Sequence, residues 1–149
     1  MARQVITKSL KETHDVARGF YSWLTQQPNG SGTGHIVCLR GDLGAGKTSF
    51  TQGLALAMGV EDNITSPTFV LMKKYKGLNE KNLVHFDVYR LENSKDLEPL
   101  RFEEYVGNLN NIVVVEWPEK IGEALPAHAH TVLFKFIDEN TREITLPYE

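Results

Sequence analysis

One eight-residue stretch has the residue types and the spacing of a phosphate-binding loop. The pattern G-x-x-x-x-G-K-[ST], known as Walker A, is matched by Gly41-Asp42-Leu43-Gly44-Ala45-Gly46-Lys47-Thr48. Glycines let successive backbone N–H groups turn toward phosphate oxygens. In this pattern Lys47 reaches the β- and γ-phosphates, and the Thr48 hydroxyl is placed to bind Mg²⁺. The stretch therefore predicts a site for a nucleotide with its magnesium ion.

A second candidate is the acid that ends a later apolar run. Residues 111–116 read Asn-Ile-Val-Val-Val-Glu, which is typical of a buried parallel strand. This is the form of a Walker B strand, whose carboxyl end presents an acid beside the phosphate loop. Glu116 stands where Asp is usual, and it can bind Mg²⁺ directly or through water. A surface glutamate at the end of a strand is the simpler alternative.

A third candidate lies in residues 83–89, where an apolar strand carries polar side chains on one face. His85, Asp87 and Tyr89 alternate along it, so they point to the same side. A carboxylate such as Asp87 on a strand of this kind is commoner at a site than in a core.

The proline-broken segment Ser66-Pro67-Thr68-Phe69 leaves two interpretations open. It is either a surface turn with two hydroxyls or a switch loop in which Thr68 senses the γ-phosphate.

These residues need a strand, a loop and a helix to position them. Residues 35–40 form a short apolar run suited to a buried strand, and residues 47–58 have a helical pattern. Ser9 and Glu12 form a capping-box pattern that starts a helix over residues 10–26. Further strands are predicted at residues 4–7, 70–75, 131–137 and 143–146, with helical pieces between 91 and 107. The fold class is α/β: a P-loop NTPase-like domain with a mixed, largely parallel sheet flanked by helices.

The composition is that of one globular domain spanning residues 1–149. A net charge of −3 argues against broad, unaided binding to nucleic acid. The single cysteine, Cys38, cannot form an internal disulfide and is expected to be a buried thiol. No apolar run reaches membrane-spanning length, so we expect a cytoplasmic protein without membrane contact. His128 and His130 could share a strand face, but no third metal ligand lies nearby.

Two absences in the sequence favour ATP hydrolysis over related chemistries. No [NT]-K-x-D stretch is present to bind a guanine base, so ATP is favoured over GTP. The chain also has little room for the lid that small-molecule phosphotransfer needs to exclude water. Slow hydrolysis is therefore the expected reaction. A small-molecule kinase and a nucleotide-regulated binding module with negligible turnover remain the alternatives.

The order and spacing of four motif blocks resemble those of the bacterial TsaE (YjeE) family. The blocks are Gly41-Asp42-Leu43-Gly44-Ala45-Gly46-Lys47-Thr48, Ser66-Pro67-Thr68-Phe69, His85-Phe86-Asp87-Val88-Tyr89-Arg90-Leu91 and Glu116-Trp117-Pro118-Glu119. With the helix that contains Thr13, the similarity covers nearly the whole chain. Such a family member is the ATPase component of the machinery that makes threonylcarbamoyladenosine beside the anticodon of tRNA. The resemblance implies ATP and Mg²⁺ as cofactors and a TsaB–TsaD complex as partner, with tRNA met only through that complex.

The resemblance also implies a role for each matching residue. Lys47, Asp87 and Glu116 would be catalytic, with Asp87 positioning the attacking water or assisting the metal. Thr48, Asp87 and Glu116 would form the metal site. The implied nucleotide-binding set is Thr13, Gly41, Asp42, Leu43, Gly44, Ala45, Gly46, Lys47, Thr48, Ser49, Thr68 and Trp117.

Two positions depart from the family pattern. Ser49 stands where a second threonine is more usual, and Leu100-Arg101-Phe102 replaces a Leu-Gly pair. Simple packing beside Pro118 is the alternative for Trp117.

Overall fold

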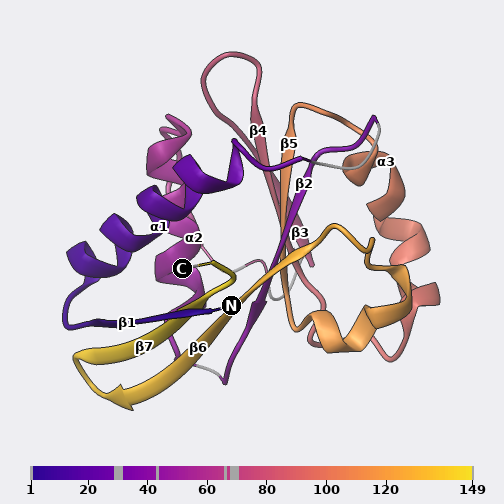
Figure 1. Cartoon of the computed structure of the whole chain (residues 1–149). Coiled ribbons are helices and arrows are strands. Elements are labelled where there is room, and N and C mark those ends of the chain that lie inside the picture. Colours follow the sequence, from indigo (N-terminus) through magenta and orange to yellow (C-terminus); the bar gives the residue numbers. More distant parts are fainter. Residues whose placement is uncertain (1, 29–31, 43, 66, 68–70, 149) are drawn as a thin grey trace.

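A single seven-stranded sheet organises the chain (Figure 1). The computed structural model describes residues 2–28, 32–42, 44–65, 67 and 71–148. The strand order across the sheet is β1-β7-β6-β2-β5-β4-β3. The strands are β1 (Arg3–Thr7), β2 (His35–Arg40), β3 (Met72–Lys76), β4 (Asn82–Asp87), β5 (Asn111–Glu116), β6 (His130–Asp138) and β7 (Thr141–Leu146).

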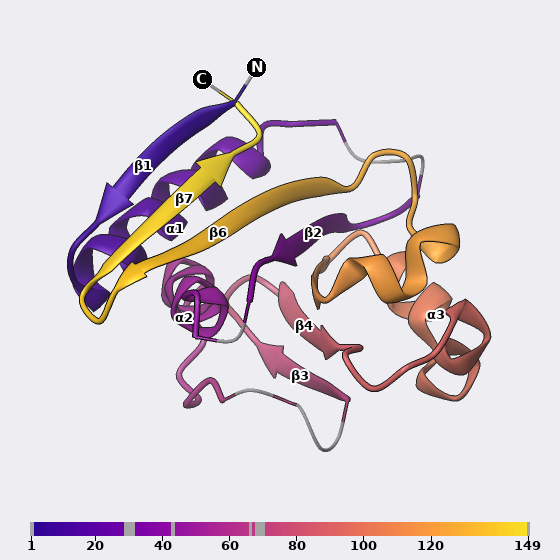
Figure 2. The same cartoon turned by 90° about the horizontal axis from the view of Figure 1, so that it is seen from below.

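Parallel pairing is concentrated in the centre of this sheet. Strand β2 is parallel to both β5 and β6, and β4 is parallel to β5. Toward the edges, β3 pairs antiparallel with β4, and β7 pairs antiparallel with both β6 and β1. Figure 2 shows β1, β7 and β6 together at one side of the molecule, with α1 behind them. The predicted mixed α/β sheet is confirmed, and its parallel part holds the strands expected to carry the site.

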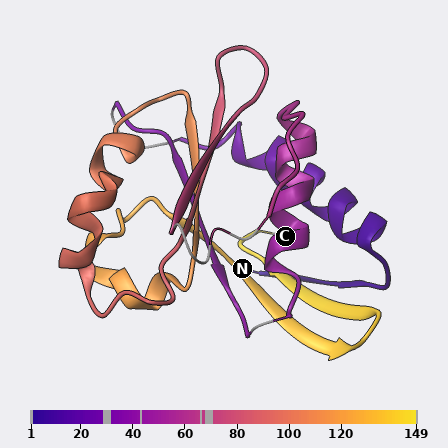
Figure 3. The ribbon, with the colours of Figure 1, turned by 180° about the vertical axis from the view of Figure 1, so that it is seen from behind.

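Helices cover both faces of the central strands (Figures 1 and 3). One face is covered by α1 (Leu10–Leu24) and α2 (Lys47–Ala57). The other is covered by two 3₁₀ helices and one short α-helix, namely η1 (Ser94–Leu100), α3 (Phe102–Val106) and η2 (Pro118–Ala124). The helices α1 and α2 pack closely because Gly53 has no side chain: a Cβ there would lie 2.6 Å from the Cβ of Ala17.

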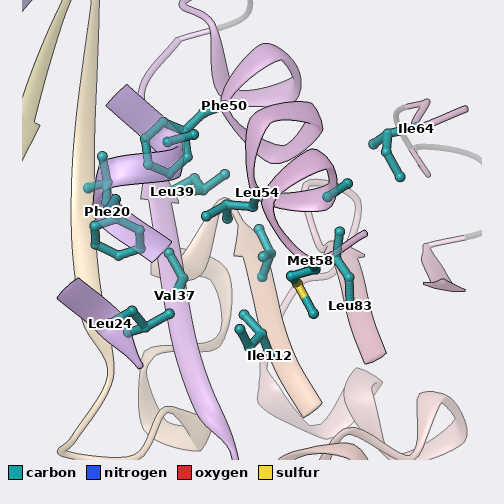
Figure 4. Packing of buried hydrophobic residues seen from close by; sticks show 14 of the residues in the cluster. Phe20, Leu24, Val37, Leu39, Phe50, Leu54, Met58, Ile64, Leu83 and Ile112 are labelled. Carbon is teal, nitrogen blue, oxygen red and sulfur yellow. The ribbon is translucent and has the colours of Figure 1, made fainter. Parts of the chain in front are cut away.

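Two separate apolar clusters result from the alternation of side chains along the strands. The α1–α2 cluster, on the face covered by α1 and α2, includes Phe20, Phe50, Leu54 and Ile112 (Figure 4). The α3 cluster, on the opposite face, contains Val84, Phe86, Val113 and Val115 from the same central strands, packed against η1, α3 and η2. A residue's place in the strand therefore decides which cluster it joins.

The predicted start of α1 is confirmed, with a small shift in its cap. The Ser9 hydroxyl accepts from the Glu12 N–H at 3.1 Å. The Glu12 carboxylate accepts from the backbone N–H of Lys8 at 2.9 Å, one residue earlier than in the usual reciprocal box. The helix ends at Leu24, two residues before the predicted end.

Cys38 is buried in β2, as expected, and burial raises the pKa of its thiol to about 12. Within the described residues, no helix is both long and apolar enough to span a lipid bilayer. His128 bonds to the Thr33 hydroxyl at 3.2 Å. No group of three or more His, Cys, Asp or Glu side chains in the described ranges could hold a metal ion.

Candidate functional site

A cavity of about 460 Å³ opens where β2, β4 and β5 end and α2 begins. Ligand sites of open α/β sheets lie at this carboxyl edge. Predicted site residues in its lining are Thr13, Gly44, Gly46, Lys47, Thr48, Ser49, Asp87, Glu116 and Trp117. Of the other predicted residues, Gly41, Asp42 and Ala45 belong to the same loop but do not line the cavity, and Leu43 and Thr68 fall outside the described residues. Residues of α1, of the glycine loop with the start of α2, and of the ends of β4 and β5 thus meet in one cavity, so three of the four motif blocks contribute to its lining.

The glycine loop turns through backbone conformations that favour glycine. Gly44 has φ +78° and Gly46 has φ +106°, both in the left-handed region that other residues rarely adopt. Gly46 directly precedes α2 and accepts the Phe50 N–H at 3.0 Å. The first N–H groups of a helix have no carbonyl partner within it, so they are available to an anion. This end of the cavity is suited to phosphate.

Lys47 places a cation inside the cavity. Its side chain is only 4% exposed, and its ammonium donates to the Gly41 carbonyl at 2.6 Å. The same nitrogen lies 4.0 Å from the centre of the Trp117 ring. Burial lowers the pKa of Lys47, and the nearby carboxylates of Glu116 and Asp87 oppose that shift. A phosphate group would add a charge-assisted hydrogen bond to the one that this buried ammonium already makes.

Two carboxylates face Lys47 from adjacent parallel strands. Asp87 at the end of β4 is in register with Glu116 at the end of β5, so both point to the same side of the sheet. Both residues are at least 95% buried. Asp87 accepts the backbone N–H of Tyr89 at 3.1 Å. With the Thr48 hydroxyl, the cavity offers the hard oxygen ligands that Mg²⁺ prefers, at a number that leaves room for phosphate oxygens and water.

Trp117 forms a wall of the cavity in an unusual backbone conformation. It has φ +63° and ψ +48°, immediately after β5 and before Pro118. Its ring lies 4.9 Å from that of Tyr89, centre to centre. The packing expected beside Pro118 is thus only part of its environment, because the ring also contacts the ammonium of Lys47.

Sequence reasoning placed His85 on the face of Asp87 without giving it a role, and it missed the contribution of the turn between β6 and β7. His85 is fully buried and bonds to Glu116, with 2.5 Å between Nε2 and Oε2. Its position two residues before Asp87 on one strand was a usable signal. The turn between β6 and β7 supplies Glu139 and Asn140, and Arg142 donates from Nε to the Gly44 carbonyl at 3.1 Å. Arg142 and Gly44 are 98 positions apart, so no local pattern could have paired them.

Comparison with known proteins identifies the family of this chain. The family model described as "Threonylcarbamoyl adenosine biosynthesis protein TsaE" matches residues 7–144. The chain belongs to the TsaE family. Every residue that lines the cavity, from Thr7 to Arg142, lies inside the stretch that matches the TsaE model.

Individual TsaE proteins from distant bacteria are also similar to the chain. The tRNA threonylcarbamoyladenosine biosynthesis protein TsaE of Treponema pallidum is 40% identical over 76% of this chain and 82% of its own length. The protein of the same name from Rickettsia typhi is 37% identical over 95% of this chain and 92% of its own. The crystal structure of Bacillus subtilis YdiB superposes with a TM-score of 0.75 at 30% identity, covering 98% of this chain and 84% of that one.

Proposed function

We propose that this TsaE-family protein binds ATP with Mg²⁺ and hydrolyses it slowly, and that this activity supports threonylcarbamoyladenosine formation in tRNA. The observation that carries the proposal is the shared cavity. It brings the phosphate-loop residues Lys47 and Thr48 together with two buried carboxylates, Asp87 and Glu116. A bare cation site would not need the loop, and a bare phosphate site would not need the carboxylates. Their combination supports a site for a nucleotide with its metal.

The chain's own residues divide the work of such a reaction. The loop N–H groups and Lys47 would bind and orient the phosphates, while Trp117 and Thr13 would contribute walls of the site. Thr48 and Glu116 would hold Mg²⁺, which would offset the charge that develops on the phosphate oxygens. Asp87 would either position the attacking water or assist in holding the metal. Thr68 would sense the γ-phosphate, as the switch-loop interpretation of residues 66–69 has it.

The family supports a role beside partner proteins. We propose that the chain acts in the cytoplasm with TsaB and TsaD homologues and meets tRNA only through them. In this proposal the transfer of the threonylcarbamoyl group belongs to TsaD. The net charge of −3 is consistent with an indirect meeting, because a protein that binds tRNA alone needs a basic surface.

The test is ATP hydrolysis by the purified protein, alone and with a TsaB–TsaD pair and tRNA. Wild type is compared with Glu116→Gln and Asp87→Asn, which remove one charge each without changing side-chain size. Glu103→Gln, in the exposed part of α3, is the matched control. We expect hydrolysis that depends on Mg²⁺, rises with the partners, is lost in both site variants and persists in the control.

Two other results would point to different functions. Tight ATP binding with background hydrolysis under all conditions would favour a nucleotide-regulated binding module. Phosphoryl transfer to an added small acceptor would favour a kinase.

A further inference from the structure

His85 is an unusual residue for its position in the α1–α2 side of the sheet. It is fully buried and lies two residues before Asp87, on the same face of β4. In the sheet it is in register with Val114 of β5. Within the described residues, the only hydrogen bond of its side chain joins Nε2 to Glu116 Oε2 at 2.5 Å, and its Nδ1 has no partner there. A buried polar atom without a partner costs about 1–3 kcal/mol. An apolar side chain would avoid that cost, so the contact with Glu116 is what the histidine provides.

The direction of this hydrogen bond follows from the acceptor. An ionised carboxylate only accepts, so with Glu116 ionised the His85 Nε2 carries the proton and donates it. The bond engages Oε2 of Glu116, a residue that also lines the cavity. One carboxylate oxygen is therefore tied to β4, the strand that also carries Asp87.

We propose that His85 is a positioning residue that holds the Glu116 carboxylate in the orientation that binds Mg²⁺. The inference depends on the proposed metal role of Glu116. It adds that His85 orients the Glu116 carboxylate for that role. Partners behind a metal ligand commonly change metal affinity about 10- to 100-fold when they are removed. His85 itself does not line the cavity, so it acts only through Glu116.

The chain allows a test that separates positioning from simple packing. A glutamine amide nitrogen reaches about as far from the backbone as Nε2 of histidine, whereas an asparagine amide reaches only as far as Nδ1. His85→Gln therefore keeps a donor beside Glu116, and His85→Asn does not. His85→Leu is a second variant without a donor, and it suits the surrounding apolar cluster. His35→Gln and His35→Asn, at the other end of the central strands in β2, are the matched controls.

The measured quantity is the Mg²⁺ concentration that half-saturates ATP binding, with ATP affinity in EDTA as the reference. We expect His85→Asn and His85→Leu to raise that concentration about tenfold and to leave ATP affinity in EDTA unchanged. His85→Gln and both His35 variants should stay near wild type. Equal behaviour of the Gln and Asn variants would overturn the proposal, as would an equal loss of ATP affinity in EDTA.

A double variant distinguishes failure of this inference from failure of the proposed metal role. If Glu116→Gln raises the Mg²⁺ requirement, adding His85→Asn to it should have no further effect, because the acceptor's role is already lost. An additive effect would show that His85 acts independently of Glu116. If Glu116→Gln alone leaves the Mg²⁺ requirement unchanged, the metal role of Glu116 is wrong and this inference is overturned with it.

Discussion

The two faces of the central sheet differ in what they bury. On the side of α1 and α2, β4 and β5 carry His85, Asp87 and Glu116 among apolar neighbours. On the side of α3, the same two strands carry apolar side chains such as Phe86 and Val115. The polar side chains on this face are Asn82 and Asn111, which start the two strands and bond to each other at 3.0 Å. Successive residues of one strand therefore have different surroundings: one face leads to the cavity, and the other packs against η1, α3 and η2. Substitutions on the α3 side should change stability, and those at the cavity should change ligand binding.

The largest expected effect is on the packing face. Phe86→Ala removes a fully buried ring whose centre is 5.1 Å from that of Phe102 and 6.0 Å from that of Tyr105. We expect the free energy of unfolding, measured in urea, to fall by about 3–5 kcal/mol. ATP affinity of the protein that remains folded should not change. Leu109→Ala, at an exposed leucine, is the control. A fall in ATP affinity for Phe86→Ala would contradict the separation of the cavity face from the α3 face.

The reactivity of Cys38 reports whether water reaches the sheet face that packs against η1, α3 and η2. Its thiol pKa is raised from 9.0 to about 12 by burial, and the thiolate is the form that reacts. At pH 8 the folded protein should therefore react with a thiol reagent about a thousandfold more slowly than the unfolded chain. The folded rate should keep rising tenfold per pH unit beyond pH 9. A folded rate that levels off near pH 9 would show that water reaches this face.

Lys47→Met should separate binding from stability at the cavity. Loss of the cation should weaken ATP binding by about 3 kcal/mol, roughly a hundredfold, measured by calorimetric titration. Without nucleotide, the free energy of unfolding should not fall, because burial already disfavours the ammonium. Lys11→Met, in an exposed part of α1, is the control.

The pH dependence of the Lys47 variant carries a definite sign. Because burial lowers the pKa of Lys47 in the folded protein, its charge costs folding free energy at neutral pH. The cost disappears as the pH rises through the lowered pKa toward the ordinary value of 10.5. Wild type should therefore gain stability relative to Lys47→Met as the pH rises, and the opposite trend would contradict the burial of this charge.

The smallest expected effect is at Ser9, a residue that belongs both to the cavity and to the end of a helix. Ser9 lines the cavity and also caps α1 by accepting the Glu12 N–H at 3.1 Å. Ser9→Ala should lower the free energy of unfolding by about 1 kcal/mol, and Ser9→Gly by only a few tenths. An unchanged free energy of unfolding for Ser9→Ala would show that the side-chain cap is not what Ser9 contributes.

Sequence patterns predicted the parts of the fold that depend on neighbouring residues. The strand at residues 35–40 and the acid-ended strand at 111–116 were predicted with the bounds that β2 and β5 have. Phosphate-loop spacing and strand periodicity are local, so they can be seen without a structure. The predicted pair Asp87 and Glu116 came together because both end parallel strands. The organisation of residues 1–149 as one domain stays a prediction.

The remaining parts depend on contacts between distant segments. Nothing near Arg142 indicates that its guanidinium meets the carbonyl of Gly44. The bond between His85 and Glu116 requires the register of β4 with β5, which periodicity alone does not give. Thr13 reached the cavity's lining through the packing of α1 beside α2, and its hydroxyl lies 2.8 Å from that of Thr7. The roles of these residues stay predictions until binding is measured.

The antiparallel pairing of β1 with β7 has a consequence for biosynthesis. Strand β1 lies at the edge of the sheet and pairs only with β7 among the described strands. While the ribosome is still translating the middle of the chain, residues 3–7 have no strand to join. The phosphate loop emerges early, yet the wall that Arg142 and the neighbouring turn supply arrives more than ninety residues later. A nascent chain therefore cannot assemble the complete cavity until residue 142 has been translated.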